Sequence, residues 1–383
     1  MKIKNFIKNV VISALVVASV ICVSNIFDTK EVRAAETGGF ATATGSNRSG
    51  VVVRNLRELE RAFAERNHHI IIAGTINGGP QLKTFTFADT GWNNTTIEGM
   101  PGTNPTLENI QIKFSGEQLP EGTNINNVVI KNITFRGKIP DLQRLSGSAI
   151  VPGGSGTNYL GISFRRTTNA LVDHCTLFDT SDDLMLISLQ SDRVTVSYCH
   201  FYFTNEWVGM NPNPMWNWVG RYQDLASERL AMVIGANRND SYEYGGKKLR
   251  VTMHHNWFGP NIKGRPLMRG YVHLYNNYFD NSTTPSGTNS RGSSQGQYNA
   301  NQIGSGSAVY SEGNYFYKTN QSNQIGLDSN GDKYSFFEKN NVYNQTTGNS
   351  ARGSYFNKNF GYNYSVDSVY NVPNIVQSQA GAR

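Results

Sequence analysis

The sequence has little charge, little cysteine and no long helix-forming stretch. Only 16% of its 383 residues are Asp, Glu, Lys or Arg, and it holds 3 Cys and 12 Pro. The low charge and the 38% hydrophobic content argue against a disordered chain. Three cysteines are too few for a disulfide scaffold. The absence of Ala/Glu/Lys/Leu-rich runs also argues against a helical bundle and a coiled coil.

Aromatic and turn-forming residues are abundant instead. The chain contains 38 Gly, 19 Tyr and 19 Phe, with many Asn, Thr and Ser, a composition typical of strands and turns. No linker-like change in composition follows residue 50, and the length is ample for a large core. We expect a single β-rich domain over residues 35–383.

The first 34 residues read as a secretory signal. Lys2, Lys4 and Lys8 precede an apolar run at residues 10–23, and Val32 and Ala34 stand at signal-peptidase spacing. A membrane anchor needs about 20 apolar residues, more than this run offers. The sequence therefore predicts a secreted, extracellular protein without a membrane association.

The charge balance permits a polyanionic partner. The formal net charge is +7, and removing residues 1–34 takes away five basic and two acidic residues, which leaves about +4. An acidic polysaccharide is compatible with this charge. Nucleic acid is not indicated, because no basic run is interleaved with aromatic residues.

A repeat runs through the middle of the chain. Each copy has an apolar residue, then Asn or Cys three positions later, then Leu or Phe two positions beyond. Four copies match well and two match loosely: residues 172–177, 196–201, 253–258, 274–279, 311–316 and 339–343. A period in the twenties, built from short strands without an amphipathic helix, predicts a parallel β-helix.

The recurring Asn slot supports a β-helix over other all-β folds. Stacked coils would place Asn256, Asn277, Asn314 and Asn341 in one ladder that satisfies buried backbone groups. Cys175 and Cys199 occupy the same slot; the pattern leaves open whether they form a disulfide. A sandwich would need frequent hairpin turns and a propeller a longer period, and neither explains the slot.

The pattern also predicts how the solenoid starts and where it is interrupted. Asn55 can cap a short helix at residues 56–63, which would close the N-terminal end of the stack before the first coil at residues 70–76. Two insertions, at residues 205–229 and 281–306, interrupt the coils. Long loops on a rigid scaffold are where binding sites are expected.

These residues resemble polysaccharide lyase family 1, the pectate and pectin lyases. The resemblance rests on the order and spacing of segments across most of the chain: residues 70–76, 171–174, 194–197, 251–256, 265–266 and 272–277. It implies a right-handed parallel β-helix, a secreted enzyme, and cleavage of α-1,4-linked galacturonan by β-elimination. That reaction abstracts the C5 proton of a uronic acid and must stabilise the resulting enolate-like charge.

The resemblance implies a calcium site in pectate-acting members. Asp173 matches an acidic position before His, and Asp182 matches the first carboxylate of a calcium-binding pair, but the second falls at Leu186. Asp183 or Asp179 could substitute for the missing ligand. Calcium stays a candidate cofactor at Asp173, Asp182 and Asp183, with a solvated turn cluster as the alternative. No organic cofactor is implied.

The resemblance also implies an arginine base. Matching Arg to Pro places the base at Arg265, whereas an ungapped count back from Val272 places it at Lys263. Arg269 is expected to contact a substrate carboxyl group. A lysine of pectate-acting members falls at Leu230, next to Arg229. Surface ion pairs with acidic residues are the alternative role for the two arginines of this motif.

The apolar substitutions and an aromatic insertion favour esterified pectin, whereas the basic net charge favours pectate, so both substrates stay open. Trp207, Trp216 and Trp218 could stack on sugar faces, or pack the insertion onto the solenoid. The histidines of the repeat are expected to be structural. We expect a monomer.

Two other functions stay open on the same scaffold. A galacturonan hydrolase needs paired carboxylates, which Asp182 and Asp183 superficially supply, but the other motifs of such hydrolases do not occur. A non-catalytic β-helical carbohydrate-binding or adhesion protein would keep the scaffold without the base.

Overall fold

The computed structural model describes residues 37–149, 159–218, 221–282, 300–327, 333–347 and 358–383. The predicted signal at residues 1–34 lies outside these ranges. Within them, no helix is long and apolar enough to cross a membrane.

The described residues form three long parallel sheets, which we call A, B and C. Sheet A contains β1 (Val51–Val53), β2 (His69–Ile72), β5 (Thr95–Gly99), β8 (Ile125–Lys131), β11 (Thr167–Asp173), β14 (Asp192–Ser197), β19 (Arg250–His254), β22 (Tyr271–Tyr275), β25 (Ala308–Glu312) and β28 (Ser335–Lys339). Sheet B contains β3 (Thr75–Asn77), β6 (Thr106–Glu108), β9 (Thr134–Arg136), β12 (Thr176–Phe178), β15 (His200–Tyr202), β20 (Trp257–Phe258), β23 (Tyr278–Asp280), β26 (Tyr315–Tyr317) and β29 (Val342–Asn344). Sheet C contains β4 (Lys83–Phe87), β7 (Ile110–Ser115), β10 (Ile162–Arg165), β13 (Met185–Ser188), β18 (Met232–Ile234), β21 (Leu267–Met268), β24 (Asn301–Gly304) and β27 (Asn323–Leu327).

Few residues lie in other elements. The helices are α2 (Leu56–Ala64), α3 (Ile139–Leu142), α4 (Asn205–Val208) and α5 (Val372–Gln379), with short 3₁₀ turns at η2 (Thr90–Trp92), η3 (Leu225–Ser227) and η4 (Val369–Asn371). A two-stranded antiparallel ribbon joins β16 (Met215–Trp218) to β17 (Arg221–Asp224).

The chain visits the sheets in the order A, B, C and then returns to A one coil further on, which makes a parallel β-helix. The register matches the sequence repeat. Val172 pairs with Val196, Val196 with Met253, and Met253 with Leu274, so the first residue of each copy stacks on the next. The predicted fold is therefore confirmed, and the stacked apolar residues form one continuous core.

The predicted Asn ladder is also present. The side-chain oxygen of each Asn accepts the backbone N–H of the slot residue one coil earlier: Asn277 from Asn256 at 3.1 Å, Asn314 from Asn277 at 2.9 Å, and Asn341 from Asn314 at 2.9 Å. The side-chain nitrogen of Asn277 also donates to the carbonyl of Met253 at 2.9 Å. Each buried turn is thus satisfied by its neighbour, because an amide carries both a donor and an acceptor.

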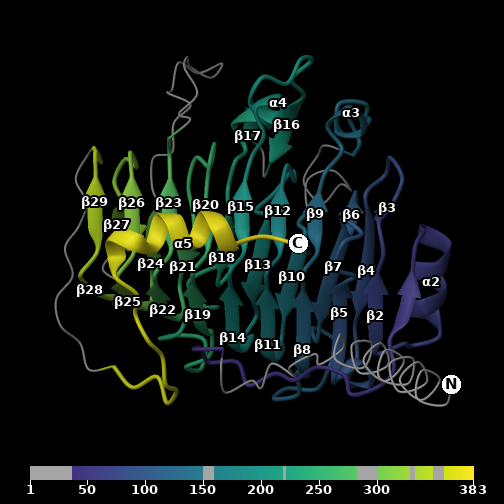
Figure 1. Cartoon of the computed structure of the whole chain (residues 1–383), viewed down its shortest axis with the longest axis horizontal. Coiled ribbons are helices and arrows are strands. Elements are labelled where there is room, and N and C mark those ends of the chain that lie inside the picture. Colours follow the sequence, from purple (N-terminus) through teal and green to yellow (C-terminus); the bar gives the residue numbers. More distant parts are fainter. Residues whose placement is uncertain (1–36, 150–158, 219–220, 283–299, 328–332, 348–357) are drawn as a thin grey trace, which may run out of the picture.

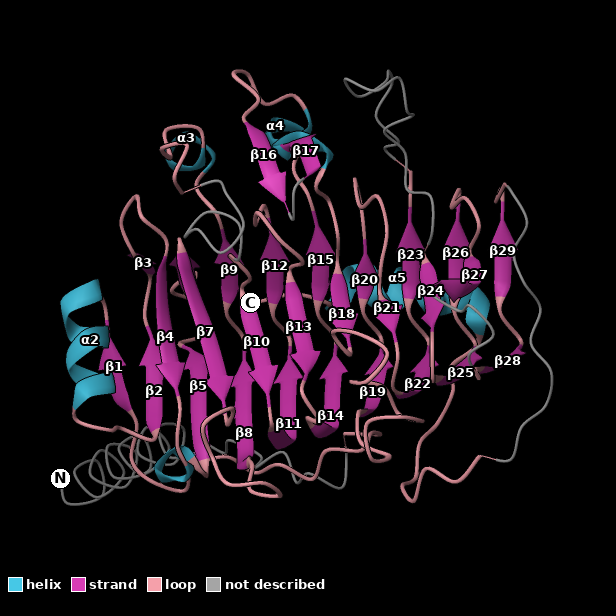
Figure 2. Cartoon of the chain, turned by 180° about the vertical axis from the view of Figure 1, so that it is seen from behind, coloured by secondary structure: helices cyan, strands magenta, loops and turns pink. Residues whose placement is uncertain are grey.

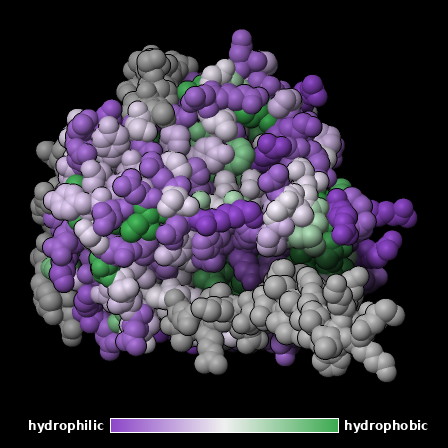
Figure 3. All heavy atoms as spheres, viewed as in Figure 1, coloured by the Kyte–Doolittle hydropathy of each residue, from purple (hydrophilic) through white to green (hydrophobic). Residues whose placement is uncertain are grey.

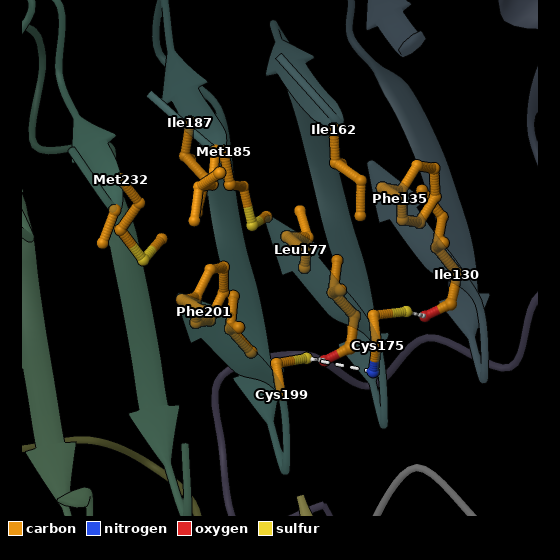
Figure 4. Packing of buried hydrophobic residues seen from close by; sticks show 14 of the residues in the cluster. Ile130, Phe135, Ile162, Cys175, Leu177, Met185, Ile187, Cys199, Phe201 and Met232 are labelled. Atoms are coloured by element: carbon orange, nitrogen blue, oxygen red, sulfur yellow. Dashed lines mark hydrogen bonds between the residues drawn. The ribbon is translucent and has the colours of Figure 1, made fainter. Parts of the chain in front are cut away.

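Cys175 and Cys199 continue this ladder as free thiols. Both are buried, and neither is in a disulfide. The Cys199 sulfur accepts the backbone N–H of Cys175 at 3.4 Å, and Figure 4 shows both side chains among the apolar core residues. The question that the sequence left open is answered: the two cysteines act as small core residues.

We expect a thiol assay to show this burial. Native protein should react slowly with a thiol reagent, since both sulfurs are fully enclosed, and denatured mature protein should show two fast-reacting thiols. A reductant should leave the melting temperature unchanged. A fall in melting temperature with dithiothreitol would contradict the free-thiol assignment.

Helix α2 lies beside β1 at one end of the stack (Figure 2). Asn55 is its N-cap, and its side chain accepts the backbone N–H of Glu58 at 3.0 Å, as the sequence predicted. Leu59 is buried in the main core, and the ring of Phe63 stacks on Trp92.

An N-terminal segment, residues 37–47, crosses the outer face of sheet A. Its backbone N–H groups bind side-chain oxygens on successive strands; Phe40 donates to Thr252, Ala41 to Thr195 and Thr42 to Asn169. The pattern continues to β8 and β5, where Thr44 donates to Asn127 and Ser46 to Thr96.

The C-terminal segment, residues 358–383, packs against sheets A and B. Val372 and Val376 of α5 pack on Tyr278 of sheet B, and α5 crosses this face in Figure 1. The same face is largely hydrophilic in Figure 3, with only small separate hydrophobic patches. The chain ends by donating from the backbone of Arg383 to Asn132.

Acid should loosen the contact of the C-terminal segment with sheet A. Burial alone would raise the pKa of Glu312, but hydrogen bonds from His273 and Tyr364 lower it to about 2. Because an unfolded glutamate titrates near about pH 4.3, this stabilisation is present above that pH and is lost as the pH falls toward 2. Between pH 5 and pH 2.5 we expect the melting temperature of E312Q to fall less than that of the wild type. The exposed E121Q should follow the wild type; equal curves for all three proteins would contradict the assignment.

The long insertions project from one edge of the stack. Sheet B strands are followed by sheet C strands, and α3, α4 and the β16–β17 ribbon all lie in these B-to-C connections. Figures 1 and 2 show them on the same side of the solenoid. One boundary differs from the prediction: the insertion assigned to residues 281–306 contains strand β24 at Asn301–Gly304, because that strand completes sheet C. Residues 283–299 lie outside the described ranges.

Candidate active site

A cluster of charged side chains lies at this edge, where three neighbouring B-to-C connections meet sheet C. The connection before β13 carries Asp182 and Asp183, the one before β18 carries Glu228, and the one before β21 carries Lys263 and Arg265. The strand pairs β13–β18 and β18–β21 hold the three connections next to one another. The fold thereby brings Asp182 and Asp183 next to basic residues 80 or more positions later in the sequence.

Arg265 and Asp183 form the central contact. The Nε atom of Arg265 lies 3.3 Å from Oδ1 of Asp183, and the two side chains keep 19% and 11% of their surface exposed. Arg265 has a backbone φ of +85°, a left-handed conformation that a residue with a Cβ rarely adopts. Many other non-glycine residues of the described ranges also have a positive φ, so Arg265 is the leading candidate for a reacting group because its partly exposed side chain meets Asp183.

The surrounding acids are held in a poorly solvated, mutually repelling arrangement. Burial raises the pKa of Asp182, and the charge of Asp183 raises it further. Burial also raises the pKa of Asp183, against the opposing charges of Arg265 and Arg269. The pKa of Glu228 is raised by burial too, with Lys263 acting in the opposite direction. The acids therefore depend on nearby basic side chains to stay ionised.

The structure separates the two candidate bases. Lys263 directs its Nζ toward the backbone carbonyl of Ser227 at 3.4 Å, whereas Arg265 faces Asp183. Arg269 follows strand β21 and donates from Nη1 to the carbonyl of Gly235 at 2.7 Å. Gly235 and Gly304 leave room for it, because a Cβ at either position would come within 2.9 Å of the Arg269 side chain. Arg269 is thus fixed over sheet C with 7% of its surface exposed.

Asp173 and Asp179 do not join the cluster. Asp173 ends β11 in sheet A, where its carboxylate accepts hydrogen bonds from Ser197 at 2.6 Å and from His174 at 2.7 Å. Asp182 and Asp183 instead precede β13 in sheet C, on another face of the solenoid. The prediction that Asp173 shares a calcium ion with them is therefore wrong. Asp179 is buried, and both of its oxygens are used by Thr204.

Two predicted substrate contacts are also corrected. Trp207 is fully buried and donates from Nε1 to the carbonyl of Glu228 at 3.1 Å, so it anchors the insertion and cannot stack on a sugar. Arg229, just before β18, is fully buried as well. The side chains of Trp216 and Trp218 lie outside the described residues.

Four histidines of the repeat hydrogen-bond within or beside the coils. His200 bonds the carbonyl of Gly259 at 2.8 Å, and His273 bonds Glu312 at 3.0 Å. His254 and His255 bond each other at 2.9 Å.

Sequence reasoning missed Glu228. Nothing in the residues around it signals that the stacking of the coils brings it near Asp183.

The described residues do not fit a protein-bound calcium ion at this cluster. Calcium takes six to eight oxygen ligands. Oδ1 of Asp182 accepts the backbone N–H of Asp183, and the carboxylate of Asp183 faces Arg265. Leu186 lies at the next outward position of sheet C. Within the described ranges, no three His, Cys, Asp or Glu side chains come together to hold a metal ion.

The fold and this cluster define a β-helical protein whose long loops place charged side chains over one sheet. A family model described as pectate lyase matches residues 9–208 and 222–383. The chain therefore belongs to the pectate lyase family.

Curated relatives carry the same family name. The pectate trisaccharide-lyase of Thermotoga maritima is 25% identical over 231 residues, which are 60% of this chain and 50% of that protein. The pectate lyase of Bacillus subtilis is 26% identical over 302 residues, 76% of this chain and 64% of that protein. This chain thus spans about half to two thirds of the length of these relatives.

Solved structures of pectate lyases share the fold. One, described with an anti β-elimination mechanism, has a TM-score of 0.65 at 19% identity and covers 93% of this chain and 99% of its own. The enzyme of Bacillus sp. N165, in complex with trigalacturonate, has a TM-score of 0.58 at 19% identity, with 90% and 98% covered. The likeness confirms the right-handed parallel β-helix that the sequence predicted.

Proposed function

We propose that this protein is a polysaccharide lyase that cleaves α-1,4-linked galacturonan by β-elimination. The observation that carries the proposal is the contact of Arg265 with Asp183 beside sheet C, in a chain of the pectate lyase family. The trigalacturonate complex of the Bacillus sp. N165 enzyme supports the same class of substrate.

In this mechanism Arg265 removes the C5 proton of the sugar. The C–H electrons form the C4–C5 double bond, the C4–O bond breaks, and the departing oxygen takes up a proton. The neutral guanidine form of Arg265 accepts this proton and becomes a guanidinium, and Asp183 orients the side chain through the contact at 3.3 Å. Arg269 and Lys263 supply positive charge near the developing enolate, where a preorganised cation stabilises the transition state.

The test is the ultraviolet absorbance of the conjugated unsaturated uronate that elimination leaves. Mature protein is given polygalacturonate and highly methylated pectin, each with calcium and with a chelator. Rising absorbance on either substrate is expected. Release of reducing ends without absorbance would mean hydrolysis, and binding without either would support the non-catalytic alternative.

We also propose that the enzyme is secreted as a monomer after removal of residues 1–34. The lysines and apolar run at the start of the sequence support secretion. Expression in a secreting bacterial host, followed by N-terminal sequencing and light scattering, should give a start at Ala35 and the mass of one chain. Retention of the whole protein in the membrane fraction would contradict this.

A further inference from the structure

A polar pocket lies at the C-to-A connections, away from the B-to-C connections that carry the candidate active site. Its volume is about 290 Å³, and it forms where the N-terminal segment passes the starts of β2, β5 and β8. In Figure 1, α3 and α4 lie at the top of the solenoid, whereas β2, β5 and β8 lie in its lower half. Among the described residues that line the pocket, four are Asn, one is Arg, one is His and none is acidic.

A network of hydrogen bonds fixes the asparagines of this pocket. Oδ1 of Asn127 accepts the backbone N–H of Thr44 at 2.7 Å, and Nδ2 of Asn127 donates to Oδ1 of Asn94 at 2.7 Å. Oδ1 of Asn93 accepts the backbone N–H of Asn126 at 2.8 Å. The amide groups are therefore held in place before any ligand binds.

The network uses the amide oxygens and leaves donors for a ligand. Within the described ranges, the Nδ2 groups of Asn93 and Asn94 make no hydrogen bond, although the oxygens of both amides are engaged. Arg48 is exposed, and its guanidinium forms no ion pair with a described residue. Its backbone is nevertheless fixed, because its N–H donates to Ser46 and its carbonyl accepts from Nδ1 of His69 at 2.9 Å.

His68 adds an acceptor to these donors. Its Nδ1 lies 3.0 Å from the carbonyl oxygen of Asn93, and a carbonyl can only accept, so Nδ1 carries the proton. In the neutral ring Nε2 is then an acceptor, and it makes no hydrogen bond within the described ranges. The pocket thus offers a cation and amide donors together with an acceptor for a hydroxyl group.

This combination favours a sugar that carries a carboxylate. A guanidinium forms strong charge-assisted hydrogen bonds with a carboxylate, and no acidic side chain lines the pocket to oppose them. The amide donors and Nε2 of His68 match the oxygens and the protons of sugar hydroxyl groups. The volume of about 290 Å³ is at the lower end of the range for ligand pockets, which suits a short piece of a polysaccharide.

We propose that this pocket binds a uronic acid unit of galacturonan outside the active site. The carboxylate of the sugar lies on Arg48, and its hydroxyl groups lie on the free amides and on His68. The choice of galacturonan rests on the lyase function proposed above. A long chain held here is kept at a raised local concentration near the enzyme without touching Arg265.

Calorimetry of R265A with trigalacturonate measures this binding without turnover. We expect R265A/R48A to lose one binding site per chain, or about tenfold or more in its affinity, because the charge-assisted hydrogen bonds are removed. R265A/R57A is the matched control, since Arg57 is an exposed arginine on α2 outside the pocket. A stoichiometry and affinity that R48A leaves unchanged, or that R57A lowers equally, would overturn the inference.

Two further ligands test the chemical class that the pocket recognises. Methyl galactoside has the hydroxyl groups without the carboxylate, and inorganic phosphate has negative charge without the sugar. We expect both to bind R265A at least tenfold more weakly than trigalacturonate. Phosphate binding of equal strength that R48A removes would mean a general anion site, and equal binding of methyl galactoside would show that the charge has no role; either result contradicts the assignment.

Kinetics separates this inference from the lyase function itself. On long polygalacturonate, R48A should raise KM about threefold or more at unchanged kcat, because only a long chain can use the second site. On trigalacturonate, R48A should keep the wild-type kcat and KM, and a fall in kcat there would contradict a site outside the active site. Absence of the unsaturated product with every protein would refute the lyase function, whereas the calorimetry decides on the pocket independently.

Discussion

Replacing Arg265 with alanine is expected to reduce kcat about 10³-fold, within the range that a positioned proton-transfer group supplies. The side chain is the best placed of the candidate bases, because its Nε lies 3.3 Å from Asp183, whereas Lys263 directs its Nζ toward the carbonyl of Ser227. The measurement is the initial rate of unsaturated product on the preferred substrate at saturation.

Two further variants separate chemistry from folding. R265A leaves the buried Asp183 without its cation, so part of its effect could come from lost stability. R265K keeps a positive charge for Asp183 but loses the planar guanidinium, and we expect a native melting temperature with kcat still reduced about 10²-fold. K263A should lower kcat far less than R265A; the opposite order would transfer the role of base to Lys263.

Replacing Asn277 with leucine is expected to cost about 4 kcal/mol of stability. The Asn277 side chain accepts the backbone N–H of Asn256 and donates to the carbonyl of Met253. Leucine can do neither, so both backbone groups stay buried without these partners. Each such group costs about 1–3 kcal/mol. We expect the melting temperature to drop by roughly 10 °C in a thermal scan.

N344A is the matched control for this ladder variant. Asn344 lies in β29 and donates to the hydroxyl of Tyr315 at 2.7 Å, from a half-buried position. Its removal should cost about 1 kcal/mol, the usual net contribution of one hydrogen bond. Similar losses for N277L and N344A would mean that the ladder adds no stability beyond that of ordinary polar contacts.

The fold could be predicted because each copy of the repeat can be recognised from a short stretch of neighbouring residues. The slot shared by Cys175, Cys199 and Asn256 needs only its immediate neighbours to be recognised, and Asn55 marks the start of α2 in the same local way. Strand β24 was missed, because it follows an insertion rich in Ser and Gly and has a single large apolar residue, Ile303.

The site was harder to predict because it depends on which loops meet. Arg265 and Asp183 were both singled out from the sequence, but their contact follows from the stacking of the coils that carry them. Trp207 and Arg229 have residue types typical of binding sites, yet both are buried, and only the packing of the insertion determines this. Asp173 was grouped with Asp182 because both match positions of the family motif, whereas Asp173 ends β11 in sheet A and Asp182 precedes β13 in sheet C.

The two terminal segments change how this molecule should unfold. A solenoid in which each coil contacts only its neighbours can lose coils one after another from either end. Here the backbone of Phe40 hydrogen-bonds to Thr252, and that of Arg383 to Asn132. The terminal segments thereby connect coils that are far apart in the sequence. Fraying of one coil then loosens the ties on others, and we expect a single cooperative transition in place of progressive erosion.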